Sequence, residues 1–316
     1  MGKVYCKSDF EKLEREYKFE RLKQKDQEQS NHEQNAGPTS PKTSIARKVG
    51  RALSGLWQIV RNPWLLNLVI DNEEDWRKKV IKKYGLESGL PFIDIQDLFP
   101  EFEEVVSPYA FLDGSCQPTD LALLRALARK FKAESYLEIG TWRGESVANV
   151  APLVREAVSL NLPDAQMKAM GLSTDYIGLH RYFSENIPNV KHLLANSLTF
   201  DFKSLGKAFD LIFIDGDHHY AAVRSDTEKV LVALKKDEGI MVWHDYARSQ
   251  GQVRWSVLAA ILDALPTQMH KHLYYISNTL SAVYLPILNQ GVLPRVLNAN
   301  EKPKKFFEVK LKIVKM

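Results

Sequence analysis

Cysteine is scarce in this sequence: only Cys6 and Cys116 occur among its 316 residues. Their spacing is not that of a metal site, and two cysteines do not make the disulfide framework of a small secreted domain. The first residues are charged and lack the apolar segment of a signal peptide. We therefore expect a cytoplasmic protein in a reducing compartment.

A large excess of charge of one sign is absent as well. The chain has 43 Lys and Arg residues against 39 Asp and Glu residues, and this net charge of +4 is too small to indicate a nucleic-acid partner. No nucleic-acid-binding module is visible in the sequence, so we predict no such partner. The hydrophobic fraction of 45% is that of an ordinary soluble protein, and the length allows one large domain with appendages.

The first hundred residues differ in composition from the rest of the chain. Residues 7–35 are dense in charged side chains and Gln, which favours a mobile charged arm; a solvated helix or a brief coiled coil is the alternative. Residues 35–43 contain the Gly and Pro of a linker. We therefore divide the chain into a charged arm with its linker at 1–43, a helical extension at 44–104, and a compact domain at 105–316.

The extension begins with the pattern of an amphipathic helix, which we expect to be capped by Ser44. Apolar side chains recur on one side at helical spacing, and basic side chains occupy the other. The apolar ones are Ile45, Val49, Leu53, Leu56, Trp57 and Val60, and the basic ones are Arg47, Lys48 and Arg51. Arg61 and Pro63 separate this helix from the apolar run at 64–70, so we expect no membrane span.

A basic face with tryptophans is typical of a helix that lies on an anionic membrane surface. Peripheral contact with the inner face of the membrane through residues 44–70 is therefore one hypothesis for this segment. The alternatives are that its apolar face packs on the main domain, or that the extension forms a contact in a homo-oligomer.

Downstream of residue 105, segments with the pattern of strands alternate with segments with the pattern of helices. The predicted strands are 136–139, 157–163, 190–194, 209–215 and 239–245, then an antiparallel pair at 273–276 and 281–285, and an extra strand at 306–314. The predicted helices are 120–131 with Thr119 as N-cap, 145–154, 177–187, 220–234 and 253–265, with a loop at 168–176. This alternation predicts an α/β fold: a Rossmann-like, doubly wound, mostly parallel seven-stranded sheet with an antiparallel closing strand pair, plus a helical N-terminal extension.

The first predicted strand runs directly into a glycine turn. Gly140 and Gly144 bracket this turn, where a side chain would keep the backbone away from a ligand, and a helix opens at Glu145. Glu138 places a carboxylate at the strand's end, where a bound ammonium or sulfonium group could use it. One loose glycine motif also occurs in nucleotide-binding domains without chemistry, so this turn alone does not define a cofactor site.

Two further strand ends carry clusters of acids and imidazoles. Asp215 is followed by Asp217, His218 and His219, and His244-Asp245 ends the next predicted strand. In a doubly wound sheet these ends meet in one crevice with the glycine turn. Their convergence favours a functional site over isolated structural residues.

The segment from about Asp113 to Leu285 resembles the class I S-adenosylmethionine-dependent methyltransferases, and more narrowly the family often called methyltransferase domain 24. The resemblance is carried by residues 137–146, 209–218 and 243–246. It implies S-adenosylmethionine as cofactor, held by a cradle to which Asp215 also contributes. The other implied cradle residues are Glu138, Gly140, Thr141, Trp142 and Gly144.

Two positions depart from the family pattern. Asn161 ends the second strand, where an acid usually holds the ribose hydroxyls, and Asn196 follows the third strand, where an acid often contacts the adenine amine. An amide can accept one hydroxyl hydrogen bond but loses the charge-assisted pair. If Asn161 faces elsewhere, Asp164 is the next residue that could contact the ribose.

Methyl transfer is an in-line displacement in which the protein aligns the nucleophile and removes its proton. The sequence leaves two mechanisms open for a hydroxyl acceptor. His218 or His219 could act as general base beside Asp215. Alternatively, a divalent ion such as Mg²⁺ could be held by Asp215 and Asp245, with His244 as a weaker ligand.

The predicted function is methylation of an oxygen on a small molecule, with a sugar or glycan precursor as acceptor. One alternative is a binding module of the same fold whose catalysis has lapsed, which the two amides favour. The other is an NAD-dependent oxidoreductase, which a Gly-x-x-x-Gly turn and paired Asp and His residues disfavour. A simple Asp245–Arg248 ion pair would be the structural explanation of the second cluster.

Overall fold

The computed structural model describes residues 45–61, 72–112, 114–249, 251–288, 292–296 and 307–314. The chain divides into two compact units, residues 1–67 and residues 68–316, which we describe separately. The predicted charged arm, its linker, the Ser44 cap and the apolar run at 64–70 lie outside the described residues.

In the first unit, the described part is the helix α2, Ile45–Arg61. This confirms the helix that the apolar periodicity predicts. It ends two residues before Pro63, which has no backbone N–H and cannot continue a helix. No helix within the described part of the chain is long and apolar enough to cross a membrane.

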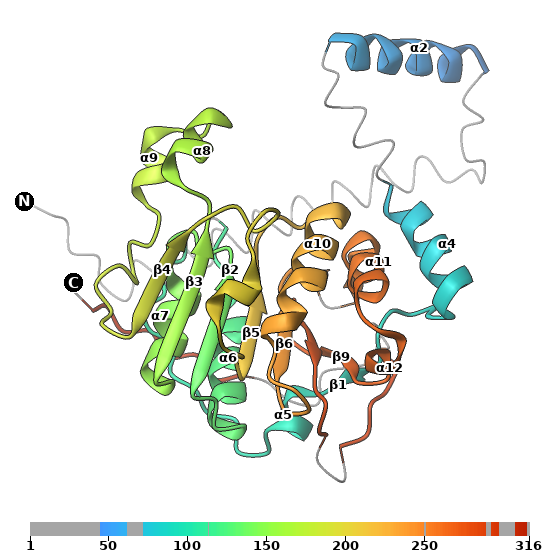
Figure 1. Cartoon of the computed structure of the whole chain (residues 1–316). Helices are drawn as coiled ribbons and strands as arrows, with labels where there is room; N and C mark the ends of the chain where they lie inside the picture. The colour runs from blue at the N-terminus through green and yellow to red at the C-terminus, as the bar shows by residue number, and fades with distance from the viewer. Residues whose placement is uncertain are drawn as a thin grey trace, which may run out of the picture. The chain divides into compact units, whose positions relative to one another are not determined.

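The second unit is built on an eight-stranded sheet in the order β1-β9-β10-β6-β5-β2-β3-β4 (Figure 1). Neighbouring strands are parallel except β10, which runs antiparallel to both β6 and β9. The strands are β1 Phe92–Ile93, β2 Ser135–Ile139, β3 Glu156–Asn161, β4 Val190–Leu194, β5 Leu211–Ile214, β6 Ile240–Trp243, β9 Leu273–Ile276 and β10 Ala282–Tyr284. The predicted doubly wound sheet with its antiparallel closing pair is confirmed, and β1 adds an eighth strand beside β9.

Successive side chains of a strand point to opposite faces, and both faces of this sheet are covered. Tyr136 and Leu137 of β2, for example, belong to the cores on opposite faces. One core includes side chains of α4 Glu73–Tyr84, α10 Tyr220–Val230 and α11 Trp255–Ala264, and the other those of α5 Ile95–Leu98, α6 Pro118–Lys130 and α7 Glu145–Val150. The central strands are therefore mostly apolar, and most of their polar side chains lie at the strand ends.

Residues before 105 also belong to this unit. The Ser256 hydroxyl of α11 donates a 3.0 Å hydrogen bond to Glu73 at the start of α4, and Tyr84 at its end donates a 2.5 Å bond to Asp263. β1 lies within the sheet itself. The compact unit thus begins earlier than the boundary expected at residue 105, because α4 packs on α11.

Some predicted local elements are wrong. Residues 307–314 form no strand, and the helix predicted at 177–187 is replaced by turns after α9, Thr174–Gly178. The predicted loop at 168–176 contains the start of α9 and the end of α8, Asp164–Ala169. Ser173 caps α9 by accepting a hydrogen bond from the Tyr176 N–H. The N-cap of α6 is Gln117, and Thr119 lies inside the helix. Between α11 and β9 lies the short α12, Thr267–His270, and β7 Ala247–Ser249 pairs with β8 Gln252–Val253 as a separate ribbon.

Candidate active site

The register of the sheet places the sequence-predicted residues in one row. Ile139, Leu160, Ile214 and Trp243 are aligned across four neighbouring parallel strands. The residues that follow them are Gly140, Asn161, Asp215 and His244. The pairing continues into this row, since the Asp215 N–H donates to Ile139 and the His244 N–H to Ile214, at 2.8 and 3.0 Å.

Gly140 allows the turn after β2 to touch the end of β5. Its φ is +87°, and a Cβ built on it would lie 2.2 Å from the backbone oxygen of Asp215. A side chain cannot be accommodated against fixed backbone at that distance. Gly144, the N-cap of α7, has φ +82°, and its Cβ would lie 2.1 Å from the Ser184 hydroxyl. The protein's own packing therefore requires both glycines, in addition to the ligand approach expected from the sequence.

Glu138 is a fully buried acid at the end of β2. Tyr136 donates a 2.6 Å hydrogen bond to its Oε2, while the buried Oε1 has no hydrogen-bond partner among the described residues. Burial raises the pKa of Glu138 to about 8, although the hydrogen bond from Tyr136 acts in the opposite direction. A carboxylate oxygen that is buried without a partner fits a site for a cationic ligand group.

Replacing Glu138 by glutamine is expected to stabilise the ligand-free protein at high pH. Because the pKa is higher in the folded than in the unfolded chain, the acid's contribution is complete below its unfolded pKa and is lost as pH rises through about 8. Each unit of such a shift corresponds to about 1.4 kcal/mol. Urea unfolding should show Glu138→Gln more stable than the parent at about pH 9 and equal to it below the unfolded pKa of a glutamate, about 4.3.

The same substitution is expected to weaken binding of S-adenosylmethionine. A bound ammonium favours the ionised form of Glu138, whereas the amide of glutamine cannot ionise. Unfolding titrations with and without the ligand separate the two effects. Equal stability of the two proteins at high pH would contradict the raised pKa.

Thr141 and Trp142 lie in the glycine turn itself. The Thr141 side chain is buried and hydrogen-bonds the Ser159 hydroxyl of β3, so it holds the turn to the sheet. The Trp142 ring stacks on Tyr176 of α9 with 5.2 Å between centroids, and the Arg143 guanidinium lies 4.0 Å from the Trp142 ring centroid. These side chains give the turn an aromatic wall.

The two amides occupy different environments. Asn161 is partly buried, and its Nδ2 contacts the Nδ1 of His180, whose pKa is lowered by burial. Asn196 is engaged in a local turn, because its Oδ1 accepts a 2.9 Å hydrogen bond from the Leu198 N–H. Asn196 thus has a structural role within its own loop. The partner of Asn161 is His180, which could also pair with the carboxylate of an aspartate at position 161.

Asn161→Asp is expected to keep or improve the affinity for S-adenosylmethionine, because a carboxylate accepts hydrogen bonds from both ribose hydroxyls. Calorimetric titration of the parent and the variant measures the difference. A large loss of affinity would show that Asn161 does not face the ribose and would direct attention to Asp164.

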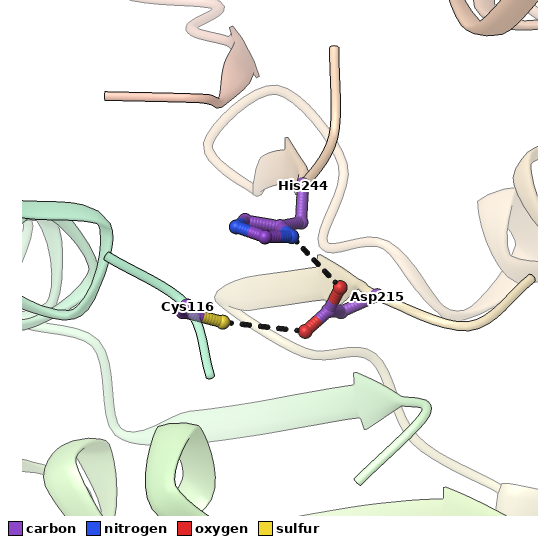
Figure 2. A group of neighbouring side chains, drawn as sticks. All are labelled: Cys116, Asp215 and His244. Atoms are coloured by element: carbon purple, nitrogen blue, oxygen red, sulfur yellow. Dashed lines mark hydrogen bonds and ion pairs between the residues drawn. The ribbon is translucent and has the colours of Figure 1, made fainter. Parts of the chain in front are cut away.

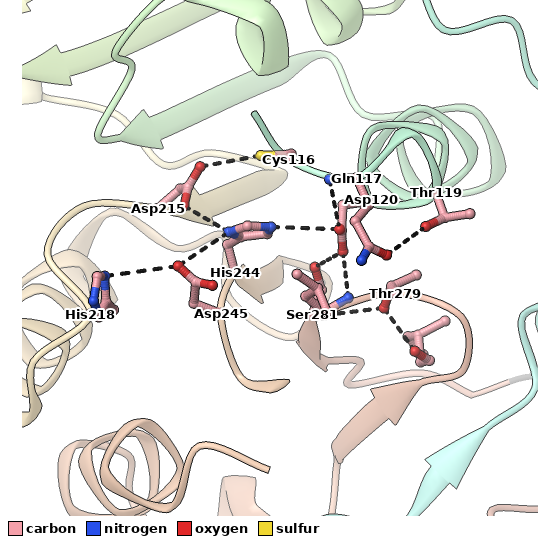
Figure 3. Close-up of polar contacts among 12 residues, drawn as sticks. Cys116, Gln117, Thr119, Asp120, Asp215, His218, His244, Asp245, Thr279 and Ser281 are labelled. Atoms are coloured by element: carbon pink, nitrogen blue, oxygen red, sulfur yellow. Dashed lines mark hydrogen bonds and ion pairs between the residues drawn. The ribbon is translucent and has the colours of Figure 1, made fainter. Parts of the chain in front are cut away.

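His244 lies among three acids, of which Asp120 is buried and Asp215 and Asp245 are partly exposed (Figure 3). Its Nδ1 is 3.0 Å from Asp215 Oδ1, and its Nε2 is 3.5 Å from Asp120 Oδ2. Asp120 is fully buried and accepts hydrogen bonds from the Leu280 N–H and the Ser281 hydroxyl, at 2.8 and 2.7 Å.

The charge of His244 follows from this setting. Burial by itself lowers the pKa of the imidazole, but the adjacent Asp215 and Asp120 carboxylates act in the opposite direction, and the pKa is raised well above its usual value. His244 is then an imidazolium at neutral pH. It balances the charge of its neighbours and cannot accept a further proton.

Cys116 joins this cluster from the loop before α6 (Figure 2). Its Sγ lies 3.4 Å from Asp215 Oδ2, and burial raises the pKa of its thiol, so the thiol is neutral and donates to the carboxylate. Cys116, Asp215 and His244 each offer one donor atom, all within 4.8 Å of one another.

This donor set does not fit the predicted Mg²⁺ ion. Magnesium prefers oxygen ligands in an octahedral arrangement, whereas a thiol and an imidazole suit zinc and other transition metals. Asp245, the second predicted carboxylate ligand, is paired instead with Arg254, 3.2 Å away. We therefore derive no reaction step through a magnesium ion.

Asp245 connects the buried cluster to the more exposed loop after β5. It has φ +58°, and its Oδ2 lies 3.6 Å from His244 Nδ1 and 3.9 Å from His218 Nδ1. Its pKa is lowered because His244 and Arg254 outweigh the opposing effect of burial. The ion pair with Arg248 considered from the sequence is not formed, since Arg248 lies 3.8 Å from Glu73 and Arg254 takes its place.

The two adjacent histidines of that loop have different partners. The His218 and His219 rings stack with 5.4 Å between centroids, and both are exposed. The His219 Nδ1 and its backbone N–H both contact Asp217, whereas His218 faces Asp245. Only His218 of this pair is connected to the row of strand ends.

Three residues of the cluster around Asp215, His244 and Asp245 are not predicted by the sequence motifs. They are Cys116, Asp120 and Arg254, which come from the loop before α6, from α6, and from the residue before α11. The one available signal is Asp120, an acid in an otherwise apolar stretch three residues after the helix cap. Cys116 and Arg254 carry no sequence signal of this kind.

Residues 137–246 match the family model Methyltransf_24, described as a methyltransferase domain. The match runs from β2 to the residue after Asp245 and so includes the whole row of strand ends. With the sheet order, the match supports a methyltransferase domain of the class I, S-adenosylmethionine-dependent type at residues 137–246. The predicted resemblance is confirmed by this match.

Three solved structures similar to this chain are 15–18% identical to it in sequence. CalS11, a TDP-rhamnose 3'-O-methyltransferase of calicheamicin biosynthesis, is 16% identical with a TM-score of 0.38, covering 53% of this chain and 78% of its own. The Podospora anserina methyltransferase PaMTH1 is 18% identical with a TM-score of 0.41, covering 67% and 94%. A Staphylococcus aureus protein described as a caffeoyl-CoA O-methyltransferase is 15% identical with a TM-score of 0.39, covering 71% and 97%. A search of curated proteins gave no match to the sequence.

Proposed function

We propose that this protein transfers the methyl group of S-adenosylmethionine to a hydroxyl of a small molecule, with a sugar or glycan precursor as acceptor. The observation that carries the proposal is the contact between the two halves of the site. A Cβ on Gly140 would lie 2.2 Å from the Asp215 backbone. The glycine turn at 140–144 and the cluster of acids and imidazoles around Asp215 and His244 are therefore directly adjacent.

On the cofactor side, S-adenosylmethionine supplies an electrophilic methyl group on a sulfonium. Glu138 offers its unpartnered Oε1 to the cationic part of the molecule. The turn from Gly140 through Thr141 and Trp142 to Gly144 supplies backbone and aromatic contacts, and Asn161 and Asn196 are proposed on the ribose and adenine side. Asp215 closes the cradle next to Gly140.

On the acceptor side, His218 is the proposed general base. It is 52% exposed, so a ligand can reach it, and its Nδ1 faces the Asp245 carboxylate at 3.9 Å. A carboxylate beside one imidazole nitrogen orients the ring and stabilises the imidazolium formed when the other nitrogen takes the acceptor's proton. His219 is held by Asp217, and His244 is already charged, so neither is placed as well for this role.

Asp215 and His244 then act as fixed charges behind the base. Asp215 is held by His244 and by the Cys116 thiol, which keeps its carboxylate oriented at the end of β5. This buried support positions the Asp245 loop through the 3.6 Å His244–Asp245 contact. Positioning of this kind, rather than covalent chemistry, is what an in-line displacement requires of the protein.

A turnover assay tests the proposal. The full chain is incubated with S-adenosylmethionine and a panel of nucleotide sugars and free sugars, and release of S-adenosylhomocysteine is measured. We expect release that depends on one class of acceptor. Binding of the cofactor without release for any acceptor would favour the lapsed binding module, which the amides at 161 and 196 already suggest.

A further inference from the structure

The helix α2 has the charge of a membrane-binding element. Its 17 residues contain four basic side chains, Arg47, Lys48, Arg51 and Arg61, and no acidic one. The net charge of the whole chain is also +4, so the rest of the protein is balanced and the excess resides in this one helix. A surface of negative charge is the complementary partner.

The apolar side of α2 is exposed. Leu53, Leu56, Trp57 and Val60 are 63%, 62%, 57% and 73% accessible. Their spacing of three, one and three residues places them along one face of a helix. By contrast, Val257, Leu258 and Ile261 of α11 are fully buried in the sheet domain. A row of four large apolar side chains is thus available for contact with a partner.

The boundary between the two sides of α2 has the features of an interfacial helix. The Arg61 guanidinium lies 3.9 Å from the ring centroid of Trp57. An indole, apolar in its rings and polar at its N–H, and a cation that packs on it both suit the zone between lipid chains and headgroups. At about 1.5 Å per residue, α2 is about 25 Å long, shorter than the roughly 30 Å hydrocarbon core. A helix of this length with four cations lies along a bilayer rather than across it.

We propose that α2 binds the surface of an anionic lipid bilayer, with the row of Leu53, Leu56, Trp57 and Val60 inserted among the lipids. This attaches the methyltransferase domain to a membrane through a helix that lies on the bilayer surface. The inference is independent of the methylation reaction, because it concerns residues outside the strand-end site. It commits to lipid in preference to a second copy of the chain, since two helices with four positive charges each would repel.

The test uses the full chain and two vesicle preparations, phosphatidylglycerol and phosphatidylcholine. Co-sedimentation should occur with the anionic vesicles at low salt and should fall steeply toward 1 M salt, where the Debye length is about 3 Å. The double variant Leu56→Gln, Val60→Gln should reduce the bound fraction at least fivefold. The matched control Ser54→Gln, at an exposed position on the polar side of the same helix, should bind like the parent. Circular dichroism confirms that all three proteins fold.

Two results would overturn the proposal. One is equal sedimentation of the parent with and without phosphatidylglycerol vesicles. The other is a parent that is dimeric by light scattering in the absence of lipid and becomes monomeric in the Leu56→Gln, Val60→Gln variant, because a second copy would then cover the row.

Discussion

Replacing Gly140 by alanine is expected to abolish cofactor binding and to lower the free energy of unfolding by several kcal/mol. The added Cβ would lie 2.2 Å from the Asp215 backbone oxygen and 2.7 Å from the Gly216 Cα, and neither is a flexible side-chain end. The φ of +87° adds strain of roughly 1–2 kcal/mol for a residue with a side chain. Overpacking against the fixed backbone adds about 1–3 kcal/mol. The turn and the end of β5 would have to separate, which opens the site that we assign to the cofactor.

Gly171 provides the matched control. Its φ is +86°, almost the same as that of Gly140, but a Cβ on it would meet nothing within 4 Å. Gly171→Ala should therefore show only the backbone strain and should bind S-adenosylmethionine like the parent. Urea unfolding and calorimetric titration of both variants measure the two effects. Equal losses in the two variants would mean that contact with β5 is not what requires Gly140.

His218→Ala is expected to lower kcat by about a hundredfold or more, the usual contribution of a general base. The neighbouring His219→Ala should retain most of the activity. The two histidines are adjacent in sequence and stacked in space, so the comparison isolates the partner of each ring, Asp245 for His218 and Asp217 for His219. Steady-state kinetics with an acceptor found in the turnover assay provide the measurement.

The affinity for S-adenosylmethionine serves as the control for this pair. It should be unchanged in both variants, because neither histidine belongs to the proposed cradle. Full activity in His218→Ala would remove the general base from the mechanism and leave alignment of the acceptor as the source of catalysis. A larger loss of activity in His219→Ala than in His218→Ala would contradict the proposal and would assign the role of general base to His219.

The central sheet could be predicted because its signals are local. The strands at 136–139, 209–215 and 239–245 are apolar runs that end in polar residues, and in a parallel sheet such ends lie side by side. The register then brings Gly140, Asp215 and His244 into one row. Their adjacency follows from the order of strands alone, without knowledge of any side-chain contact.

The support of the site could not be predicted, because it depends on contacts across long stretches of chain. Asp120 reaches His244 from α6, and Arg254 replaces Arg248 as the partner of Asp245 because the chain turns back through β7 and β8 before α11 begins. Sequence proximity favoured Arg248, whereas geometry favours a residue nine positions away. Cys116 likewise enters the cluster only through the path of its loop.

The start of the compact domain could not be predicted for the same reason, because it too depends on contacts between distant segments. The lysines of α4 suggest a solvated helix, yet Val80 is fully buried and both ends of the helix are bonded to α11. A helix with one buried face and many exposed cations has the same composition as a free one. The two cases differ in whether another element covers the apolar face. Here α11 covers it, and the sequence of α4 gives no information about α11.

The most direct test of the account is a calorimetric titration of the purified full chain with S-adenosylmethionine and, separately, with NAD. The account predicts saturable binding of S-adenosylmethionine at one site, weakened in Glu138→Gln, and no binding of NAD. Binding of NAD with no heat from S-adenosylmethionine would contradict it, because the buried carboxylate and the glycine turn would then serve a different cofactor.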